Sequence, residues 1–225
     1  MNVLVISAHP DDETLGCGGT MLRHAAAGDS IHWLIATAAD EARYGALSGK
    51  KAAEADAVAK AYRIAQLHRL GYPPAQLDRI STQELVDGVA KVAAAAKPEI
   101  VYTVGPADVH SDHRILFEAV EAALKSFRAG DQLRRILAYE TLSSTDVRLA
   151  PDESFRPTVF VDITATLERK LEILGLYETE LQKPPLPRNA ETCRALARVR
   201  GATAGVGYAE AFQLLREVLR AGTKP

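Results

Sequence analysis

After Met1 and Asn2 the chain continues with VLVISAHPDDE, residues 3–13. Residues 3–6 are four consecutive apolar residues, which is the pattern of a short strand buried on both faces of a sheet. Directly after this strand come a histidine, His9, and three carboxylates, residues 11–13. In open α/β sheets, ligands bind beyond the carboxyl ends of the strands. The stretch therefore predicts both a central strand and a binding site at its end.

The rest of the chain alternates between strand-like and helix-like patterns. We expect strands at 31–36, 67–70, 100–104, 136–139 and 159–163, and helices at 20–27, 50–65, 85–96, 115–127, 167–181 and 208–219. Parallel strands need crossover connections, so repeated strand–helix units predict a mostly parallel sheet with helices on both faces, a Rossmann-like α/β fold. Because no internal repeat or low-complexity linker interrupts it, we expect residues 1–225 to form a single domain.

Composition and charge limit the kinds of partner that we expect for this protein. The formal net charge is -2, with 47% hydrophobic and 25% charged residues, so nothing favours a nucleic acid or an anionic membrane as partner. No apolar run approaches the roughly 18–20 residues that cross a bilayer, and residues 1–13 do not resemble a signal peptide, so we expect a cytoplasmic protein. Cys17 and Cys193 form no CxxC pair, and we expect two free, buried thiols that bind no metal. Homo-oligomers are common in general, but no pattern here specifies one.

A second polar cluster, His110-Ser111-Asp112-His113, follows the predicted strand 100–104. Adjacent like charges repel, and a divalent cation would offset the repulsion among the carboxylates of residues 11–13. Together the two clusters can supply His, Asp and His, and three N/O ligands with an open fourth position are typical of catalytic zinc. Either His110 or His113 can be the ligand, which leaves the other for proton chemistry. Imidazole and carboxylate also accept iron, cobalt or manganese.

Three further histidines, His24, His32 and His68, fall in predicted helices or strands. None has a carboxylate or histidine at ligand spacing along the sequence. We therefore expect them to be structural or surface residues.

The two clusters together resemble the LmbE/PIG-L-type de-N-acylase family, which are zinc-dependent deacetylases with a Rossmann-like core. The resemblance runs from residues 3–13 through 97–101 and 110–114 to 200–201 and 208–212. It implies metal-dependent hydrolysis of an N-acyl group, in the simplest case acetyl, from an amino sugar or sugar conjugate. The implied partner is thus a small-molecule N-acyl amino sugar or conjugate.

By that likeness, His9, Asp12 and His113 would be the metal ligands, with zinc as the first choice. Asp11 would be the general base for a water whose pKa the metal lowers towards about 7. His110 would steady the oxyanion or protonate the leaving amine. These roles are what the resemblance implies, residue by residue.

Three other residues have more peripheral implied roles. Asp112 belongs to the catalytic cluster and would act from behind the ligands. Arg43 falls where family members often place a substrate-binding arginine. Arg188 lies in the proline-containing stretch 182–189, which forms either the rim of the pocket or a solvent-exposed loop.

The chain departs from the family pattern at three places. Residues 37–41 lack the Gly-Glu pair often seen there, and Ser111 replaces a common proline. Asp108 stands where some members have a tyrosine, so this loop offers no tyrosine to an oxyanion.

Two alternatives remain beside the deacetylase interpretation. One is an amidase that cleaves a larger acyl group from a thiol-sugar or antibiotic-precursor conjugate. The other is a non-catalytic nucleotide- or sugar-binding Rossmann-like module. Residues 16–19 are glycine-rich, but they do not fit G-x-G-x-x-G and they follow the acidic cluster, where a phosphate would be repelled.

Overall fold

The structure is a computed structural model that describes residues 1–39, 41–128, 130–149 and 154–221, without the side chains of residues 42 and 43. The strands are β1 (Asn2–Ser7), β2 (Ser30–Thr37), β3 (Gln66–Tyr72), β4 (Ile100–Thr103), β5 (Arg135–Tyr139), β6 (Val159–Asp162) and β7 (Ala209–Glu217). The helices are α1 (Asp12–Ala26), α2 (Glu41–Tyr44), α3 (Leu47–Ala61), α4 (Thr82–Ala96), α5 (Ser111–Ala123), α6 (Leu167–Leu174) and α7 (Ala190–Ala204), with a 3₁₀ turn, η1, at Leu77–Arg79.

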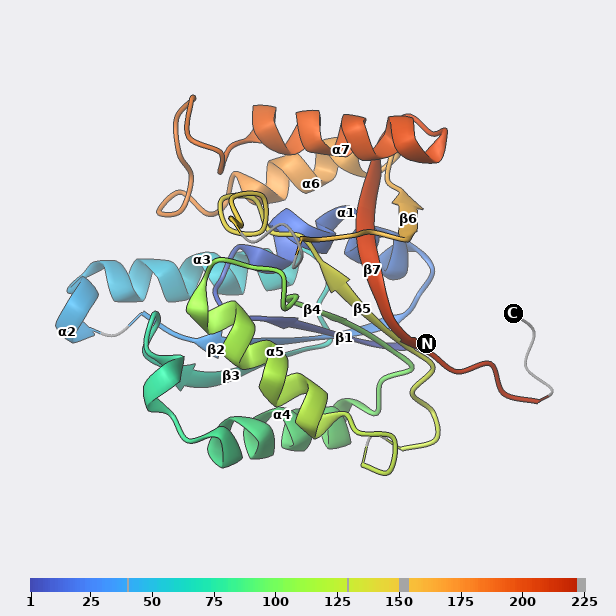
Figure 1. The fold of residues 1–225 in the computed structure, drawn as a ribbon. Coiled ribbons are helices and arrows are strands. Elements are labelled where there is room, and N and C mark those ends of the chain that lie inside the picture. The colour runs from blue at the N-terminus through green and yellow to red at the C-terminus, as the bar shows by residue number, and fades with distance from the viewer. Residues whose placement is uncertain (40, 129, 150–153, 222–225) are drawn as a thin grey trace.

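Within these residues the strands form one sheet in the order β3-β2-β1-β4-β5-β7-β6. The first five are parallel neighbours, and β7 pairs antiparallel with both β5 and β6. Helices α4 and α5 cover one face, and α1, α6 and α7 cover the other (Figure 1). The predicted mostly parallel α/β fold with helices on both faces is therefore confirmed, while the extent of the single domain, 1–225, stays a prediction.

Strand β1 lies between β2 and β4, and residues 3–6 have no solvent exposure. This central position explains the unbroken apolar run, because side chains on both faces of β1 meet helices. Since β4 is its direct neighbour, the loops that follow the two strands leave the same edge of the sheet. That adjacency brings the two polar clusters together.

Helix α1 begins at Asp12, which corrects the predicted start at residue 20. The glycine-rich stretch hid its first turns, because glycine is a poor helix former. Here the glycines permit close packing: a Cβ on Gly16 would lie 2.2 Å from the ring of Tyr139. The backbone of the helix is irregular at Cys17. Shortly after it, the Glu210 carboxylate accepts hydrogen bonds from the backbone N–H groups of residues 19 and 20, each at 2.7 Å.

The largest error of the sequence interpretation concerns the C-terminal part. The predicted helix at 208–219 was wrong, because this stretch is the strand β7, and a helix that was not predicted, α7, precedes it. Residues in β7 bond to strands on both sides, and such pairing overrides local helix propensity. The predicted helix 167–181 also ends early, at Leu174, so Leu181 lies outside it.

Two smaller expectations concern the cysteines and the membrane. Cys17 and Cys193 are free and buried, as expected. Among the described residues, no helix combines the length and the apolar character that crossing a bilayer requires.

Candidate active site

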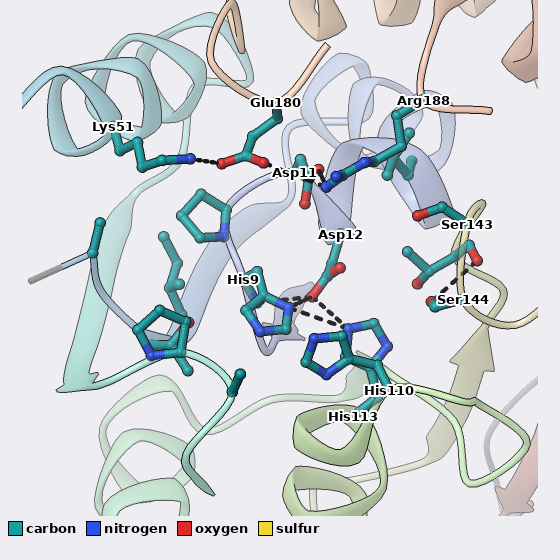
Figure 2. Close-up of a pocket in the computed structure, with 18 of the residues that line it drawn as sticks. His9, Asp11, Asp12, Lys51, His110, His113, Ser143, Ser144, Glu180 and Arg188 are labelled. Atoms are coloured by element: carbon teal, nitrogen blue, oxygen red, sulfur yellow. Dashed lines mark hydrogen bonds and ion pairs between the residues drawn. The ribbon is translucent and has the colours of Figure 1, made fainter. Parts of the chain in front are cut away.

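The two polar clusters meet at the carboxyl edge of the sheet (Figure 2). His9 lies in the turn between β1 and α1, Asp12 is the first residue of α1, and His113 lies in the first turn of α5. The clusters are distant in sequence, since His9 and Asp112 are 103 positions apart, yet His9 Nε2 and Asp112 Oδ2 are separated by 2.9 Å. The structure therefore brings the two clusters together, as expected from the sequence.

Three atoms of the predicted ligand set face one another. Asp12 Oδ2 lies 3.3 Å from His113 Nε2 and 3.6 Å from His9 Nδ1, and these two nitrogens are 3.3 Å apart. A tetrahedral zinc with bonds of about 2.0–2.1 Å has ligand atoms about 3.3 Å apart. The side chains of His9, Asp12 and His113 thus fit a zinc-sized cation without rearrangement.

Asp12 is held in place by the backbone. Its Oδ2 accepts hydrogen bonds from the N–H groups of Ala8 at 3.0 Å and His9 at 2.8 Å. These bonds exist because the chain turns sharply between β1 and α1. The carboxylate therefore faces the two imidazoles as a fixed, preorganised group.

Each imidazole is oriented by a carboxylate behind it. Asp112 Oδ2 lies 2.9 Å from His9 Nε2, and Asp108 Oδ2 lies 3.0 Å from His113 Nδ1. This leaves His9 Nδ1 and His113 Nε2 for a metal, and such outer carboxylates fix the ring and raise ligand basicity. In the sequence, Asp108 stands out only as the place of an absent tyrosine, so this contact was not predicted.

Asp108 has an anchor of its own on the loop after β5. The hydroxyls of Ser144 and Thr145 donate to its Oδ2 at 2.9 and 2.8 Å. Nothing in the sequence spacing relates this loop to Asp108, so only the fold could show the contact.

His110 supplies a third imidazole to the cluster. Ring nitrogens of His9, His110 and His113 all lie within 4.8 Å of one another, so these three could also hold a metal. The set with Asp12 is the tighter one, since its atoms are 3.3–3.6 Å apart. In addition, His110 Nδ1 accepts the backbone N–H of Asp112 at 3.2 Å, as the N-cap of α5.

The neighbouring carboxylates raise the pKa values of the two imidazoles proposed as ligands. Burial lowers the pKa of His9, but hydrogen bonds to Asp112 and Asp12 outweigh it and raise that pKa to about 9. For His113, burial is likewise outweighed, by Asp12 and Asp108, and the pKa rises to about 10. The same negative field would attract a divalent cation.

Asp11 differs from its neighbour Asp12 in backbone and in contacts. It precedes α1 with φ 105°, an uncommon conformation for a non-glycine residue and one associated with functional sites. Its Oδ2 lies 3.3 Å from Arg188 Nη1. Burial raises the pKa of Asp11 well above its usual range, the charges of Asp12 and Glu180 add to the rise, and Arg188 opposes it.

The cluster lies in a cavity of about 750 Å³. Arg188 and other residues of the stretch 182–189 line it, which favours the pocket-rim interpretation over a solvent-exposed loop. Helix α3 also lines the cavity, with Lys51 and Ala55 among its residues. Arg43 lies in α2, but its side chain is outside the described part of the chain.

The remaining histidines have partners in space that their spacing along the sequence does not show. His24 Nδ1 lies 2.7 Å from Asp29 Oδ2, and His32 Nδ1 lies 3.2 Å from His68 Nε2. His32 and His68 meet because β2 and β3 are neighbours, which linear spacing does not show. None of these three histidines lines the cavity.

Known proteins are similar to this chain in sequence and in fold. Diacetylchitobiose deacetylase of Thermococcus kodakarensis is 25% identical over 95% of this chain and 82% of its own length. The structure of N,N'-diacetylchitobiose deacetylase from Pyrococcus horikoshii superposes with a TM-score of 0.76 at 23% identity, over 95% of this chain and 83% of that one. GalB, a 4-carboxy-2-hydroxymuconate hydratase from Pseudomonas putida KT2440, has the same fold, with a TM-score of 0.74 at 18% identity over the full length of both chains.

The family comparison is more specific than the fold. The model described as PIG-L, GlcNAc-PI de-N-acetylase, matches residues 4–124, more than half of the chain. The matched region contains both polar clusters, from His9 to His113. This chain therefore belongs to the PIG-L (GlcNAc-PI de-N-acetylase) family.

Proposed function

We propose that this protein is a metal-dependent hydrolase that removes an N-acyl group, in the simplest case acetyl, from an amino sugar or a sugar conjugate. The observation that carries the proposal is the set of His9, Asp12 and His113 at tetrahedral spacing, with a further carboxylate, Asp11, directly beside it. The similarity to a diacetylchitobiose deacetylase supports an amino sugar as the substrate.

His9, Asp12 and His113 would hold the metal. Two nitrogens and one oxygen suit zinc, and iron, cobalt and manganese accept the same donors. When bound, the metal would act as a Lewis acid that activates water and polarises a carbonyl oxygen. Asp108 and Asp112 would keep the two imidazoles oriented, so Asp112 is a positioning residue in this account.

Asp11 would accept the proton of the attacking water. It is suited to this role because Asp12, and not Asp11, forms the close contacts with both ligand imidazoles. Burial and the neighbouring Asp12 and Glu180 make proton uptake by Asp11 more favourable.

His110 would donate a hydrogen bond to the oxyanion, or a proton to the leaving amine. Its Nδ1 already accepts the N–H of Asp112, so the proton of the neutral ring lies on Nε2. Burial, together with His9 and His113, lowers the pKa of His110, which favours that neutral form. A neutral Nε2–H donor suits the oxyanion role in a site that carries other positive charges, whereas the proton for the leaving amine would come from the protonated ring or from Asp11, after Asp11 has taken it from the water.

The cavity bears on the kind of substrate. Its volume of about 750 Å³ lies in the upper part of the range of about 300–1,000 Å³ found for pockets that enclose drug-sized ligands. This volume favours a disaccharide or a sugar conjugate over a single sugar. It is also compatible with the alternative substrate, a thiol-sugar or antibiotic-precursor conjugate. Arg188 and Arg43 would contact the substrate. The cytoplasmic location stays a prediction.

The test is an assay of acetate and amine release. The purified protein is given diacetylchitobiose, N-acetylglucosamine and larger N-acyl conjugates, first with zinc, then after chelation, and then with zinc restored. Chelator-sensitive release, recovered with zinc, would support the proposal. A protein that takes up zinc but releases no amine from any of these compounds would refute the hydrolase assignment, and hydration of an unsaturated acid would then be assayed, since GalB shares the fold.

A further inference from the structure

The rim of the cavity is fastened to α3 by ionic and polar contacts. Lys51 of α3 forms an ion pair with Glu180, which lies just beyond α6. Next to this pair, the backbone N–H and the hydroxyl of Thr179 donate to Glu54 at 3.1 and 2.5 Å. Glu180 is therefore held from one side by a helix of the cavity wall.

The other carboxylate oxygen of Glu180 contacts Arg188, on the side of the catalytic cluster. Glu180 Oε2 lies 3.3 Å from Arg188 Nη1, and the same Nη1 lies 3.3 Å from Asp11 Oδ2. The side chains of Lys51, Glu180, Arg188 and Asp11 thus form a continuous row along one side of the cavity (Figure 2).

Asp11 and Glu180 share one nitrogen of the Arg188 guanidinium. Ionic N–H···O bonds are usually about 2.7–2.9 Å long, and a closed arginine–carboxylate pair is often bidentate. Arg188 instead presents one nitrogen to two carboxylates at equal, longer distances, so neither pair is closed. Glu180 and Asp11 compete for this guanidinium.

That competition affects the carboxylate that must accept a proton. A closed, bidentate pair with Arg188 would engage both oxygens of Asp11 and leave neither oxygen free to contact the attacking water. Glu180 draws the guanidinium away, and Lys51 fixes Glu180 to α3. The side chains of Lys51, Glu180 and Arg188 are 16%, 21% and 30% exposed, so these contacts are better shielded than ordinary surface ion pairs.

We propose that Lys51 and Glu180 are positioning residues that hold Arg188 in this shared place and so keep Asp11 free to act as a base. The proposal rests on the proposed function, because only that function requires a base at Asp11. It also gives Arg188 a second role beside contact with the substrate. Neither Lys51 nor Glu180 needs to touch the reacting atoms.

The first experiment compares Glu180→Gln with Glu178→Gln, both loaded with zinc. Glu178 makes the same kind of contact with α3, through Lys50 at 2.8 Å, but these side chains are 70% and 49% exposed and neither contacts Arg188 or Asp11. We expect kcat of Glu180→Gln to fall about tenfold, with a smaller change in KM because Arg188 also contacts the substrate, and we expect Glu178→Gln to match the wild type.

The second readout does not depend on activity. In a crystal structure of zinc-loaded Glu180→Gln, we expect Arg188 to close on Asp11 at about 2.8 Å, whereas in the wild type and in Glu178→Gln it stays shared. Lys51→Met is expected to lower kcat and Lys51→Arg to retain it. The double variant Lys51→Met/Glu180→Gln should be no slower than Glu180→Gln alone, because both residues act through one contact.

Several results would overturn the proposal: equal kcat for Glu180→Gln and Glu178→Gln, a change in KM alone, or an Arg188 that does not move in the Glu180→Gln structure. A wild-type protein without amidase activity would instead refute the proposed function. In that case the crystal structures would still decide whether Glu180 holds Arg188 away from Asp11.

Discussion

Asp11 and Asp12 are adjacent and chemically identical, yet the fold gives them different surroundings. Asp12 accepts two backbone N–H groups and faces two imidazoles, while Asp11 has a strained backbone and faces Arg188. From the sequence alone one could predict that a carboxylate cluster would lie beside a second cluster with two histidines. The sequence could not show which oxygen faces which nitrogen, because that depends on the turn between β1 and α1.

Asp108 provides a test at this scale. We expect Asp108→Asn to weaken zinc binding by about 10- to 100-fold, since a carboxylate behind a ligand imidazole orients the ring and raises its basicity. The affinity is measured by competition with a chromogenic chelator. The control is Asp146→Asn, which changes an exposed aspartate of the neighbouring loop. Equal affinities for Asp108→Asn and the wild type would contradict the assignment of Asp108.

The shape of helix α1 depends on residues that are distant in sequence. Beyond the irregular Cys17, its N–H groups bond to Glu210 of β7, and the charge of Glu210 is balanced by Lys170 of α6 at 2.7 Å. Glu210 and Lys170 are both buried. Sequence periodicity could not reveal this arrangement, because it joins one helix to a strand that the sequence predicts as a helix.

The Glu210 contact predicts a large loss of stability on substitution. We expect Glu210→Ala to lower the free energy of unfolding by about 3–5 kcal/mol, because it leaves the buried Lys170 ammonium without its counter-charge and with only the Leu15 carbonyl as an acceptor. Urea denaturation followed by circular dichroism measures the change. Glu168→Ala, which removes an exposed pair with Arg194, should change the stability little. A loss for Glu210→Ala as small as that of the control would refute this role.

At the scale of elements, the sequence predicted the strands better than the helices. The apolar runs at β1, β2, β4 and β5 are buried on both faces, so composition alone marks them. Strand β7 was missed because its residues suit a helix locally and its strand form depends on pairing with β5 and β6. Helix α7 was missed as well, although Asn189 caps it by accepting the N–H of Thr192 at 2.9 Å.

At the scale of the whole molecule, the strand order of the sheet brings the residues of the site together. Parallel β1 and β4 are neighbours, so two loops far apart in sequence open at one edge of the sheet. The same fold also occurs in a hydratase, which means that the fold alone does not select the reaction. Function therefore has to be argued from the cluster around Asp12 and tested there.

Metal binding should be visible in the stability of the whole protein. If zinc binds only the folded chain, free zinc at about 100 times the dissociation constant stabilises it by about 2.7 kcal/mol. We expect the melting temperature of the metal-free protein to rise on adding zinc, and the rise to disappear in His113→Ala. Differential scanning calorimetry measures both. An equal rise in the variant would mean that zinc stabilises the protein elsewhere.

The most direct test of the account is amine release from diacetylchitobiose by the wild type and by Asp11→Asn at equal, measured zinc content. We expect the variant to keep one zinc per chain, since Asp11 is not a proposed ligand, but to lose at least about 10²-fold in kcat, the scale of a lost general base. Turnover of Asp11→Asn near that of the wild type, or no amine release by the zinc-loaded wild type, would refute the proposed role of Asp11 or the proposed activity.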